Sequence, residues 1–124
     1  MIGTLLQVAV GGAIGASARY LVGIGVARIA GPGMPLGVLT ANVVGCLLMG
    51  LFAGMAGRLG LGWLGPFVAT GILGGFTTFS TFSLEAVNLM QEGQTGTAIL
   101  YMALSVGAGL GALYLGLELA KAMA

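Results

Sequence analysis

Gly74-Gly75-Phe76-Thr77-Thr78-Phe79-Ser80-Thr81-Phe82-Ser83 is the stretch that decides the fold, because it interrupts a long apolar run. Adjacent glycines and β-branched threonines have poor helix propensity. Hydroxyl side chains can satisfy the backbone groups that an interrupted helix sets free at membrane depth. The stretch therefore predicts a transmembrane helix that is broken in its middle.

The composition around this stretch is that of a membrane protein. Of the 124 residues, 58% are hydrophobic and 6% are charged, with four Lys or Arg, three Asp or Glu, no histidine and a net charge of +1. A water-soluble domain would carry roughly a quarter charged residues, so we expect the chain to lie in lipid. The 25 glycines have no Gly-X-Y period and suit closely packed membrane helices. The single cysteine, Cys46, excludes an internal disulfide, and we expect it to pack as a small apolar residue.

Four spans of about twenty apolar residues fit the chain. We expect them at about Ile2 to Ala27, Leu36 to Ala56, Trp63 to Met90 and Thr97 to Leu119. The third span carries the interruption. The first is either a long helix that buries Arg19 or a shorter helix that ends near it. The sequence therefore predicts an all-α membrane protein with four transmembrane helices, the third of them broken, and residues 1–124 as a single transmembrane domain.

The basic residues outside the spans are nearly balanced between the two sides of the membrane. Arg28 falls in the first loop, whereas Arg58 in the second loop and Lys121 near the C-terminus fall on the opposite side. A bias of one against two is too small to fix one orientation. We therefore predict dual topology, in which the chain pairs with an inverted copy about a two-fold axis in the membrane plane, as inverted repeats do in transporters.

The sequence contains few residues that could catalyse a reaction. There is no histidine, no cysteine pair, no carboxylate pair within one span and no glycine-rich phosphate loop that ends in lysine. We expect neither an enzyme nor a protein that binds nucleic acid.

The polar residues within the spans are mostly hydrogen-bond donors without a formal charge. A lining of donors favours an anion over a cation, because the anion must exchange its water donors for protein donors. The alternative is that the hydroxyls return to backbone carbonyls of their own helices. The residues are Arg19, Asn42, Thr77, Thr78, Ser80, Thr81, Ser83, Tyr101 and Ser105.

Two phenylalanines, Phe79 and Phe82, fall on one face if the segment is helical after the break. They are interpreted either as ordinary packing or as rings whose positive edges face a small anion. Arg19 either reaches the membrane interface or has a functional partner or a wet vestibule. Glu85 is either that partner or the acceptor of a nearby hydroxyl.

The break also has a chemistry suited to a cation. Where Gly74 to Thr78 leave helical geometry, backbone carbonyls lose their donors and can coordinate Na⁺, as unwound helices do in transporters. If two inverted copies cross at this point, the carbonyls of both chains converge near the two-fold axis. We expect such a central cation to be structural rather than conducted.

Three motifs closely resemble those of the Fluc/CrcB fluoride channels of microbes, in the family's order. They are Gly11-Gly12-Ala13-Ile14-Gly15-Ala16 running to Arg19-Tyr20, Gly37 to Gly45 around Asn42, and Gly71 to Ser83. The resemblance covers all four spans. It implies an antiparallel, dual-topology homodimer with two fluoride pores and a central Na⁺.

The resemblance also implies roles for individual residues. Phe79 and Phe82 match the pore phenylalanines, Asn42 the pore asparagine and Arg19 the arginine of the aqueous vestibule. The carbonyls of Gly74 and Thr77 match the Na⁺ ligands. Tyr101 and Ser105 correspond to the polar track of the fourth helix, which is thin here because Gly107 and Gly109 follow where further hydroxyls are expected.

The expected function is passive fluoride export through a channel domain in the inner (plasma) membrane. Fluoride would pass Asn42 and the ring edges of Phe79 and Phe82, and then the hydroxyls of the third and fourth spans, Ser80 and Thr81 among them. One alternative is a small proton-coupled multidrug exporter, for which Glu85 is the only carboxylate within a span. The other is a structural or membrane-assembly protein without transport.

Overall fold

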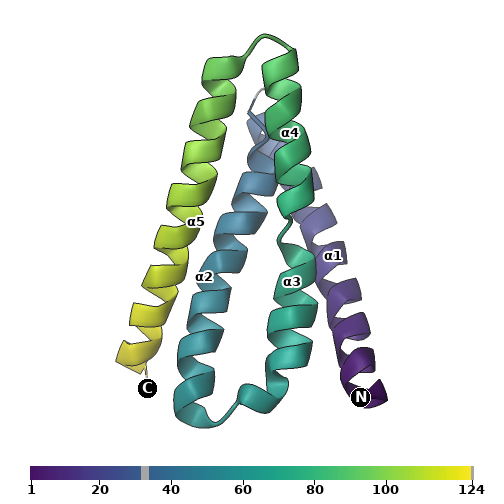
Figure 1. Ribbon diagram of the computed structural model, residues 1–124, viewed down its shortest axis with the longest axis vertical. Helices are drawn as coiled ribbons and strands as arrows, with labels where there is room; N and C mark the ends of the chain where they lie inside the picture. Colours follow the sequence, from purple (N-terminus) through teal and green to yellow (C-terminus); the bar gives the residue numbers. More distant parts are fainter. Residues whose placement is uncertain (32–33, 124) are drawn as a thin grey trace.

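The computed structural model describes residues 1–31 and 34–123 as a bundle of long helices. Figure 1 shows their arrangement. The helices, in chain order, are α1 (Ile2–Ala30), α2 (Leu36–Leu59), the short 3₁₀ helix η1 (Gly62–Leu64), the π-helix η2 (Pro66–Leu73), α3 (Gly74–Phe76), α4 (Phe79–Gln91) and α5 (Thr95–Met123).

The prediction of an all-helical chain with four potential membrane spans is confirmed. Helices α1, α2 and α5 and the segment Pro66–Gln91 are each long and apolar enough to cross a bilayer. At 1.5 Å per residue, a 29-residue helix such as α1 is about 43 Å long, more than the roughly 30 Å of a hydrocarbon core. The start of α1, the end of α5 and the connection from α2 to η1 lie at one end of the bundle, and the end of α1, the start of α2 and the connection from α4 to α5 lie at the opposite end (Figure 1).

Helices α1, α2 and α5 are longer than the sequence predicted. Helix α1 runs past Arg19 without interruption and ends at Gly31, whose φ of 72° is accessible mainly to glycine. Helix α2 likewise ends at the left-handed Gly60. Arg28 and Arg58 therefore lie in the last turns of helices rather than in loops. Of the first predicted loop, Pro32 and Gly33 lie outside the described residues.

The break in the third span is narrower than predicted. Gly74 to Phe76 remain helical, and only Thr77 (φ −91°, ψ 157°) and Thr78 (φ −151°, ψ 124°) are extended. The expectation that Gly74 and Gly75 leave helical geometry is therefore wrong. Gly75 instead permits close packing, because a Cβ there would lie 2.8 Å from the carbonyl oxygen of Gly12 on α1.

Glycines also allow the other close helix contacts, as their spacing predicted. Gly11 and Gly15 are buried on α1 against η2, and a Cβ on Gly15 would collide with the carbonyl oxygen of Ile72. A Cβ on Gly50 would collide with the carbonyl oxygen of Leu113, which brings the backbones of α2 and α5 together. Arg58 joins the same two helices at their ends, since its Nη1 donates to the carbonyl of Lys121 at 2.9 Å.

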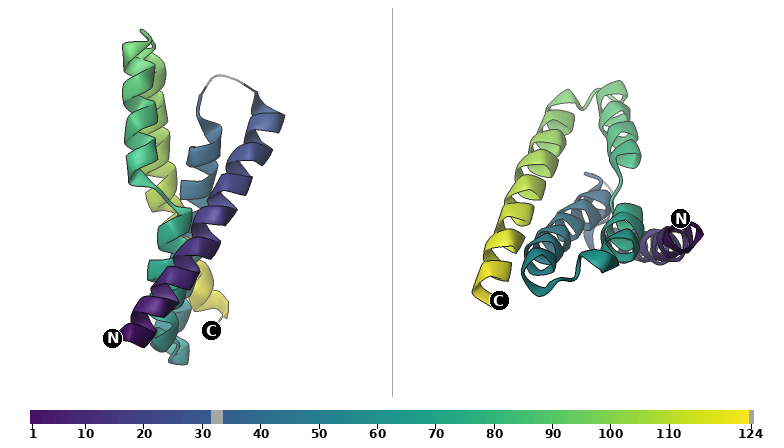
Figure 2. Two further views of the ribbon diagram at one scale, coloured as in Figure 1. Left: turned by 90° about the vertical axis from the view of Figure 1, so that its right-hand side faces the viewer. Right: turned by 60° about the horizontal axis from the view of Figure 1, so that its bottom comes forward.

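Helices α4 and α5 form a pair that separates from α1 beyond the break. Helix α4 packs on α5 through a small cluster of buried Ala86, Leu89, Ala98 and Tyr101. Figure 2 shows α4 and α5 leaning away from α1 beyond the break. Large apolar side chains are widely exposed on the single chain, among them Phe79, Leu110 and Tyr114. Such a surface is suited to lipid or to another copy of the chain rather than to water.

Candidate ion pathway

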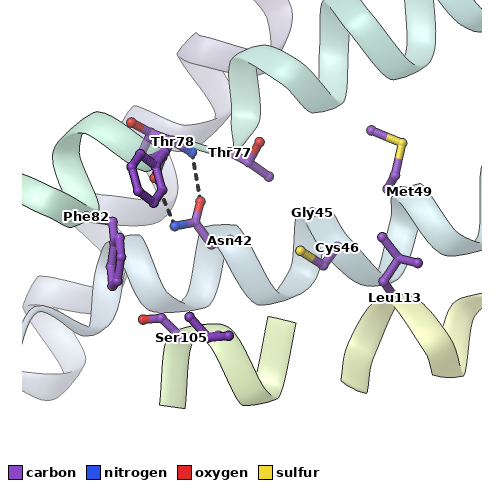
Figure 3. Close-up of a pocket in the computed structure, with 11 residues that line it drawn as sticks. Asn42, Gly45, Cys46, Met49, Thr77, Thr78, Phe82, Ser105 and Leu113 are labelled. Carbon is purple, nitrogen blue, oxygen red and sulfur yellow. Dashed lines mark hydrogen bonds between the residues drawn. The ribbon is translucent and has the colours of Figure 1, made fainter. Parts of the chain in front are cut away.

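A cavity of about 370 Å³ lies beside the break, where α2, α4 and α5 face one another. Figure 3 shows Asn42 and Cys46 from α2, Thr77 and Thr78 from the break, Phe82 from α4 and Ser105 from α5 around it. Phe79 also lines the wall, and the remaining lining residues are Gly45, Met49, Val106 and Leu113. Four predicted pathway residues therefore share one cavity: Asn42, Phe79, Phe82 and Ser105.

Asn42 binds the break through both ends of its amide. Its Nδ2 donates to the carbonyl oxygen of Thr78 at 3.0 Å, and its Oδ1 accepts the backbone N–H of Thr78 at 2.8 Å (Figure 3). The side chain thus supplies both backbone partners that Thr78 lacks outside a helix. Because a primary amide has two N–H groups, Nδ2 keeps a second donor beside the cavity.

Thr78 begins α4 as a side-chain cap. Its Oγ1 accepts the backbone N–H of Thr81 at 3.2 Å, which satisfies one of the free donors in the first turn. Ser80 Oγ lies 3.3 Å from the same hydroxyl. Neither Ser80 nor Thr81 lines the cavity. Both predicted pathway residues therefore sit at the start of α4, outside the cavity wall.

For two residues, the alternative that hydroxyls return to nearby backbone carbonyls is confirmed. Thr77 Oγ1 donates to the carbonyl of Leu73 at 3.0 Å, and Ser83 Oγ donates to the carbonyl of Phe79 at 2.9 Å. Ser105 differs, because its Oγ is buried and has no hydrogen-bond partner among residues 1–31 and 34–123. An unpaired hydroxyl at the wall of a cavity is costly unless a ligand or water satisfies it.

Three aromatic rings stack in a row from the break toward α5. The Phe79 and Phe82 ring centroids are 5.7 Å apart, and those of Phe82 and Tyr101 are 5.2 Å apart, with tilted planes in both pairs. Phe79 is 79% exposed on the single chain, whereas Tyr101 is fully buried. The prediction that Phe79 and Phe82 share one face is confirmed.

Tyr101 and Glu85 are partners behind the cavity wall. The Tyr101 hydroxyl donates to Glu85 Oε1 at 3.0 Å. Glu85 therefore accepts a nearby hydroxyl, which was one of the two roles left open for it. Tyr101 does not line the cavity itself, but its ring supports Phe82.

Arg19 contacts the break from the opposite side. Its Nε donates to the carbonyl oxygen of Gly75 at 3.2 Å. Arg19 also lines a second cavity of about 370 Å³, between α1 and α2, with Tyr20, Gly23 and Gly37 among its neighbours. Arg19 thus has a hydrogen-bond partner and lines a cavity of its own. This second cavity is separate from the one beside Asn42.

The side-chain bonds at the break divert two backbone donors from their helical acceptors. The N–H of Thr78, which would pair with the carbonyl of Gly74 in a continuous helix, donates to Asn42. The N–H of Thr81, which would pair with the carbonyl of Thr77, donates to Thr78 Oγ1. Gly74 and Thr77 are therefore left with carbonyl oxygens that suit a hard cation. No cluster of three or more His, Cys, Asp or Glu that could hold a metal occurs in the described part of the chain.

Five residues of the cavity wall were not predicted from the sequence. They are Gly45, Cys46, Met49, Val106 and Leu113. Helical spacing was the available signal on α2, since Cys46 and Met49 follow Asn42 by four and seven residues and so share its face. On α5 no polar residue occurs between Ser105 and Tyr114, so no side-chain chemistry pointed to Leu113.

Comparison with known proteins shows the family of the chain. The family model described as "CrcB-like protein, Camphor Resistance (CrcB)" matches residues 6–117. The chain belongs to the CrcB family. It is 57% identical over 122 residues to the "Fluoride-specific ion channel FluC" of Ruegeria sp. (strain TM1040), covering 98% of this chain and 97% of that protein.

Other CrcB-family relatives carry the same name. The protein of Cereibacter sphaeroides (strain ATCC 17029 / ATH 2.4.9) is 52% identical over 94% of both chains. The protein of Paracoccus denitrificans (strain Pd 1222) is 47% identical over 97% of this chain and 96% of its own length. The resemblance read from the three motifs is therefore confirmed at the level of the family.

Proposed function

We propose that the protein is a fluoride-selective channel that passes F⁻ through the cavity beside Asn42. Membership of the CrcB family and the names of the relatives support this proposal. The single structural observation that carries it is the set of donors and ring edges gathered in one cavity: Asn42, Phe79, Phe82 and the unpaired hydroxyl of Ser105.

The chemistry of this cavity fits a small anion that must also leave again. The second Asn42 N–H and the Ser105 O–H are neutral donors, and the phenyl edges carry partial positive charge. Neutral donors replace part of the hydration shell without the tight binding that a fixed positive charge would produce. Among the described residues, no Lys or Arg lines the cavity, which favours passage over trapping.

The functional unit is an antiparallel homodimer in this proposal. Phe79 is 79% exposed although it lines the cavity, and Gly74 is exposed although its carbonyl has lost its helical donor. An inverted second copy against this face would cover both residues and close the cavity. The nearly even distribution of basic residues is compatible with insertion in both orientations.

A structural Na⁺ at the centre of the dimer completes the proposal. The carbonyls of Gly74 and Thr77 would hold it, together with the same two carbonyls of the partner. Na⁺ would compensate their partial negative charges where two broken helices cross. The cation would stabilise the dimer rather than move through it.

Passive flux in the inner (plasma) membrane is enough to relieve fluoride toxicity. HF crosses lipid and dissociates in a more alkaline cytoplasm, so the trapped anion needs only a selective leak. Moving one charge through 100 mV is worth roughly 2.3 kcal/mol. An interior-negative potential therefore drives F⁻ outward.

Reconstitution tests the transport. Purified protein in liposomes loaded with KF should release fluoride to an electrode when valinomycin lets K⁺ leave, and liposomes loaded with KCl should retain chloride. Phe82→Ile and Asn42→Asp should abolish the fluoride flux while the protein still runs as a dimer. Equal rates for the two anions would contradict a selective channel, and no flux of either would favour a protein without transport.

Two further measurements test the assembly. A cysteine at Met123 in a Cys46→Ala background should be labelled equally from the two sides of the membrane by an impermeant maleimide. The thermal midpoint of the purified dimer should be higher in Na⁺ than in N-methylglucamine, because a ligand that binds only the folded state stabilises it. Labelling from one side only would exclude dual topology, and equal midpoints would exclude the Na⁺ site.

A further inference from the structure

The cavity beside Asn42 has a polar half and an apolar half. Asn42, Thr78 and Ser105 gather at one end, and Met49 and Leu113 form the other (Figure 3). An ion that leaves the first group toward the second loses its hydroxyl and amide donors. Cys46 lies between the two halves and carries the next donor along the wall, an S–H group.

The helix register places this thiol in the line of the polar groups. Cys46 follows Asn42 by four residues on α2, so the two side chains lie one above the other on one face. On α5, Gly109 follows Ser105 by the same spacing but has no side chain. A Cβ built on Gly109 would have the Cys46 Sγ as its neighbour at 3.5 Å. The Cys46 thiol therefore lies beside Gly109, the position at which α5 has no side chain.

A second observation marks this wall as a place for a ligand. The Ser105 Oγ, one turn before Gly109, is buried and unpaired among the described residues. The unpaired Ser105 hydroxyl is thus one helical turn away from Gly109, the residue that faces the Cys46 thiol. Simple packing accounts for a small side chain at position 46, but it does not account for the unpaired hydroxyl beside it.

We propose that Cys46 is a pathway residue, whose S–H donates to fluoride after Ser105 and so continues across α2 the polar track that stops on α5. This inference rests on the proposed fluoride conduction. A thiol is a weak donor, so it lowers the barrier in the apolar half without creating a site that retains the ion.

Four variants test the donor. Cys46→Ser keeps an O–H at the same atom and should conduct at least as fast as the native protein. Cys46→Ala should be about two- to tenfold slower, the range expected for one lost hydrogen bond. Gly109→Ser added to Cys46→Ala should restore the flux, because a Cβ at Gly109 meets ordinary contact distances. The matched control is Gly107→Ser added to Cys46→Ala, which should not restore it, since a Cβ on Gly107 meets no atom within 4 Å and so does not approach position 46.

A chemical readout tests the position of the thiol independently. Cys46 is the only cysteine, so methyl methanethiosulfonate can attach its S–CH₃ group at this position alone. Modification, followed by mass spectrometry, should block fluoride flux in the native protein and leave Cys46→Ser unaffected. Fluoride in the buffer should slow the modification relative to gluconate.

The outcomes separate this inference from the function on which it rests. If Cys46→Ala conducts as fast as the native protein, or if the fully modified protein still conducts, Cys46 is not on the pathway, although fluoride conduction stands. If the unmodified native protein itself releases no fluoride, the proposed function fails and the inference fails with it.

Discussion

Asn42 closes two hydrogen bonds on the backbone of a single residue, Thr78, at 2.8 and 3.0 Å. The pair joins α2 to the only extended residues of the third span. It also frees the carbonyl of Gly74 by taking the N–H that a helix would direct to it. One side chain thus fixes the break, exposes a candidate cation ligand and faces the candidate anion cavity.

Replacing Asn42 should therefore damage both stability and conduction. Asn42→Leu leaves the Thr78 N–H and C=O without partners, at a cost of about 1–3 kcal/mol for each group. We expect a lower thermal midpoint in detergent and a loss of fluoride flux of at least about tenfold. Val44→Leu, at an exposed position on the same helix, should change neither and controls for membrane insertion. An Asn42→Leu protein with native flux would show that the amide serves neither purpose.

The position of the break illustrates what the sequence was able to predict. The threonines were correctly predicted to interrupt the helix, but Gly74 and Gly75, which were expected to leave helical geometry with them, remain helical. The residues that leave the helix are Thr77 and Thr78, since the partners that stabilise the extended backbone are on other helices. Asn42 is 36 residues from Thr78 in sequence, and propensity contains no information on such a contact.

The residues of the candidate site were likewise predicted only in part. Asn42, Phe79, Phe82 and Ser105 were predicted and do share a cavity. Ser80, Thr81 and Tyr101 were predicted from the same chemistry, but Ser80 and Thr81 lie in the first turn of α4 beside the Thr78 cap, and Tyr101 supports the aromatic row. Whether a hydroxyl faces a cavity or its own backbone depends on rotamer and packing, which residue type does not determine. Cys46 was overlooked because a buried cysteine is usually inert packing.

Arg19 should control the geometry of the break through Gly75. Its guanidinium donates a hydrogen bond to the carbonyl of Gly75. Gly75 follows Gly74, one of the two residues whose carbonyls we assign to Na⁺. Arg19→Met leaves the Gly75 carbonyl without this donor and removes a charge, and we expect fluoride flux to fall by roughly ten- to hundredfold, as for a charge-assisted hydrogen bond of about 1.5–3 kcal/mol. Arg19→Lys keeps the charge but not the flat donor group, so its flux should be intermediate.

The measurement for Arg19 combines flux with the Na⁺ dependence of the thermal midpoint. A residue that acts only by attracting anions to a vestibule would change the flux alone. A residue that positions the break should also weaken the stabilisation by Na⁺. Unchanged Na⁺ dependence in Arg19→Met would therefore contradict the positioning role.

Glu85 distinguishes a channel from a proton-coupled exporter. Its carboxylate accepts the Tyr101 hydroxyl at 3.0 Å, and glutamine can accept the same bond through Oε1. Glu85→Gln should keep fluoride flux within about threefold of the native rate, because the bond that supports the aromatic row remains. Tyr101→Phe is the matched variant that removes this bond from the other side.

A proton-coupled exporter makes the opposite prediction for the same variant. Coupling requires a carboxylate that gains and loses a proton, which glutamine cannot replace. Uptake of drug-like cations driven by a pH gradient should then be measurable in the native protein and absent in Glu85→Gln. Finding it would contradict the channel proposal.

The closest approach of α2 and α5 depends on Gly50, where a Cβ would collide with the carbonyl oxygen of Leu113. Backbone cannot rotate aside as a side chain can, so Gly50→Ala forces the two helices apart at a cost of about 1–3 kcal/mol. Gly57→Ala on the same helix meets no atom within 4 Å and gains helix propensity instead, worth up to about 1 kcal/mol. The thermal midpoint should therefore fall for Gly50→Ala and stay level or rise for Gly57→Ala. Because α2 and α5 form two walls of the cavity, Gly50→Ala should also lower the ratio of fluoride to chloride flux, and a native ratio would show that the selective part of the pathway does not depend on this helix contact.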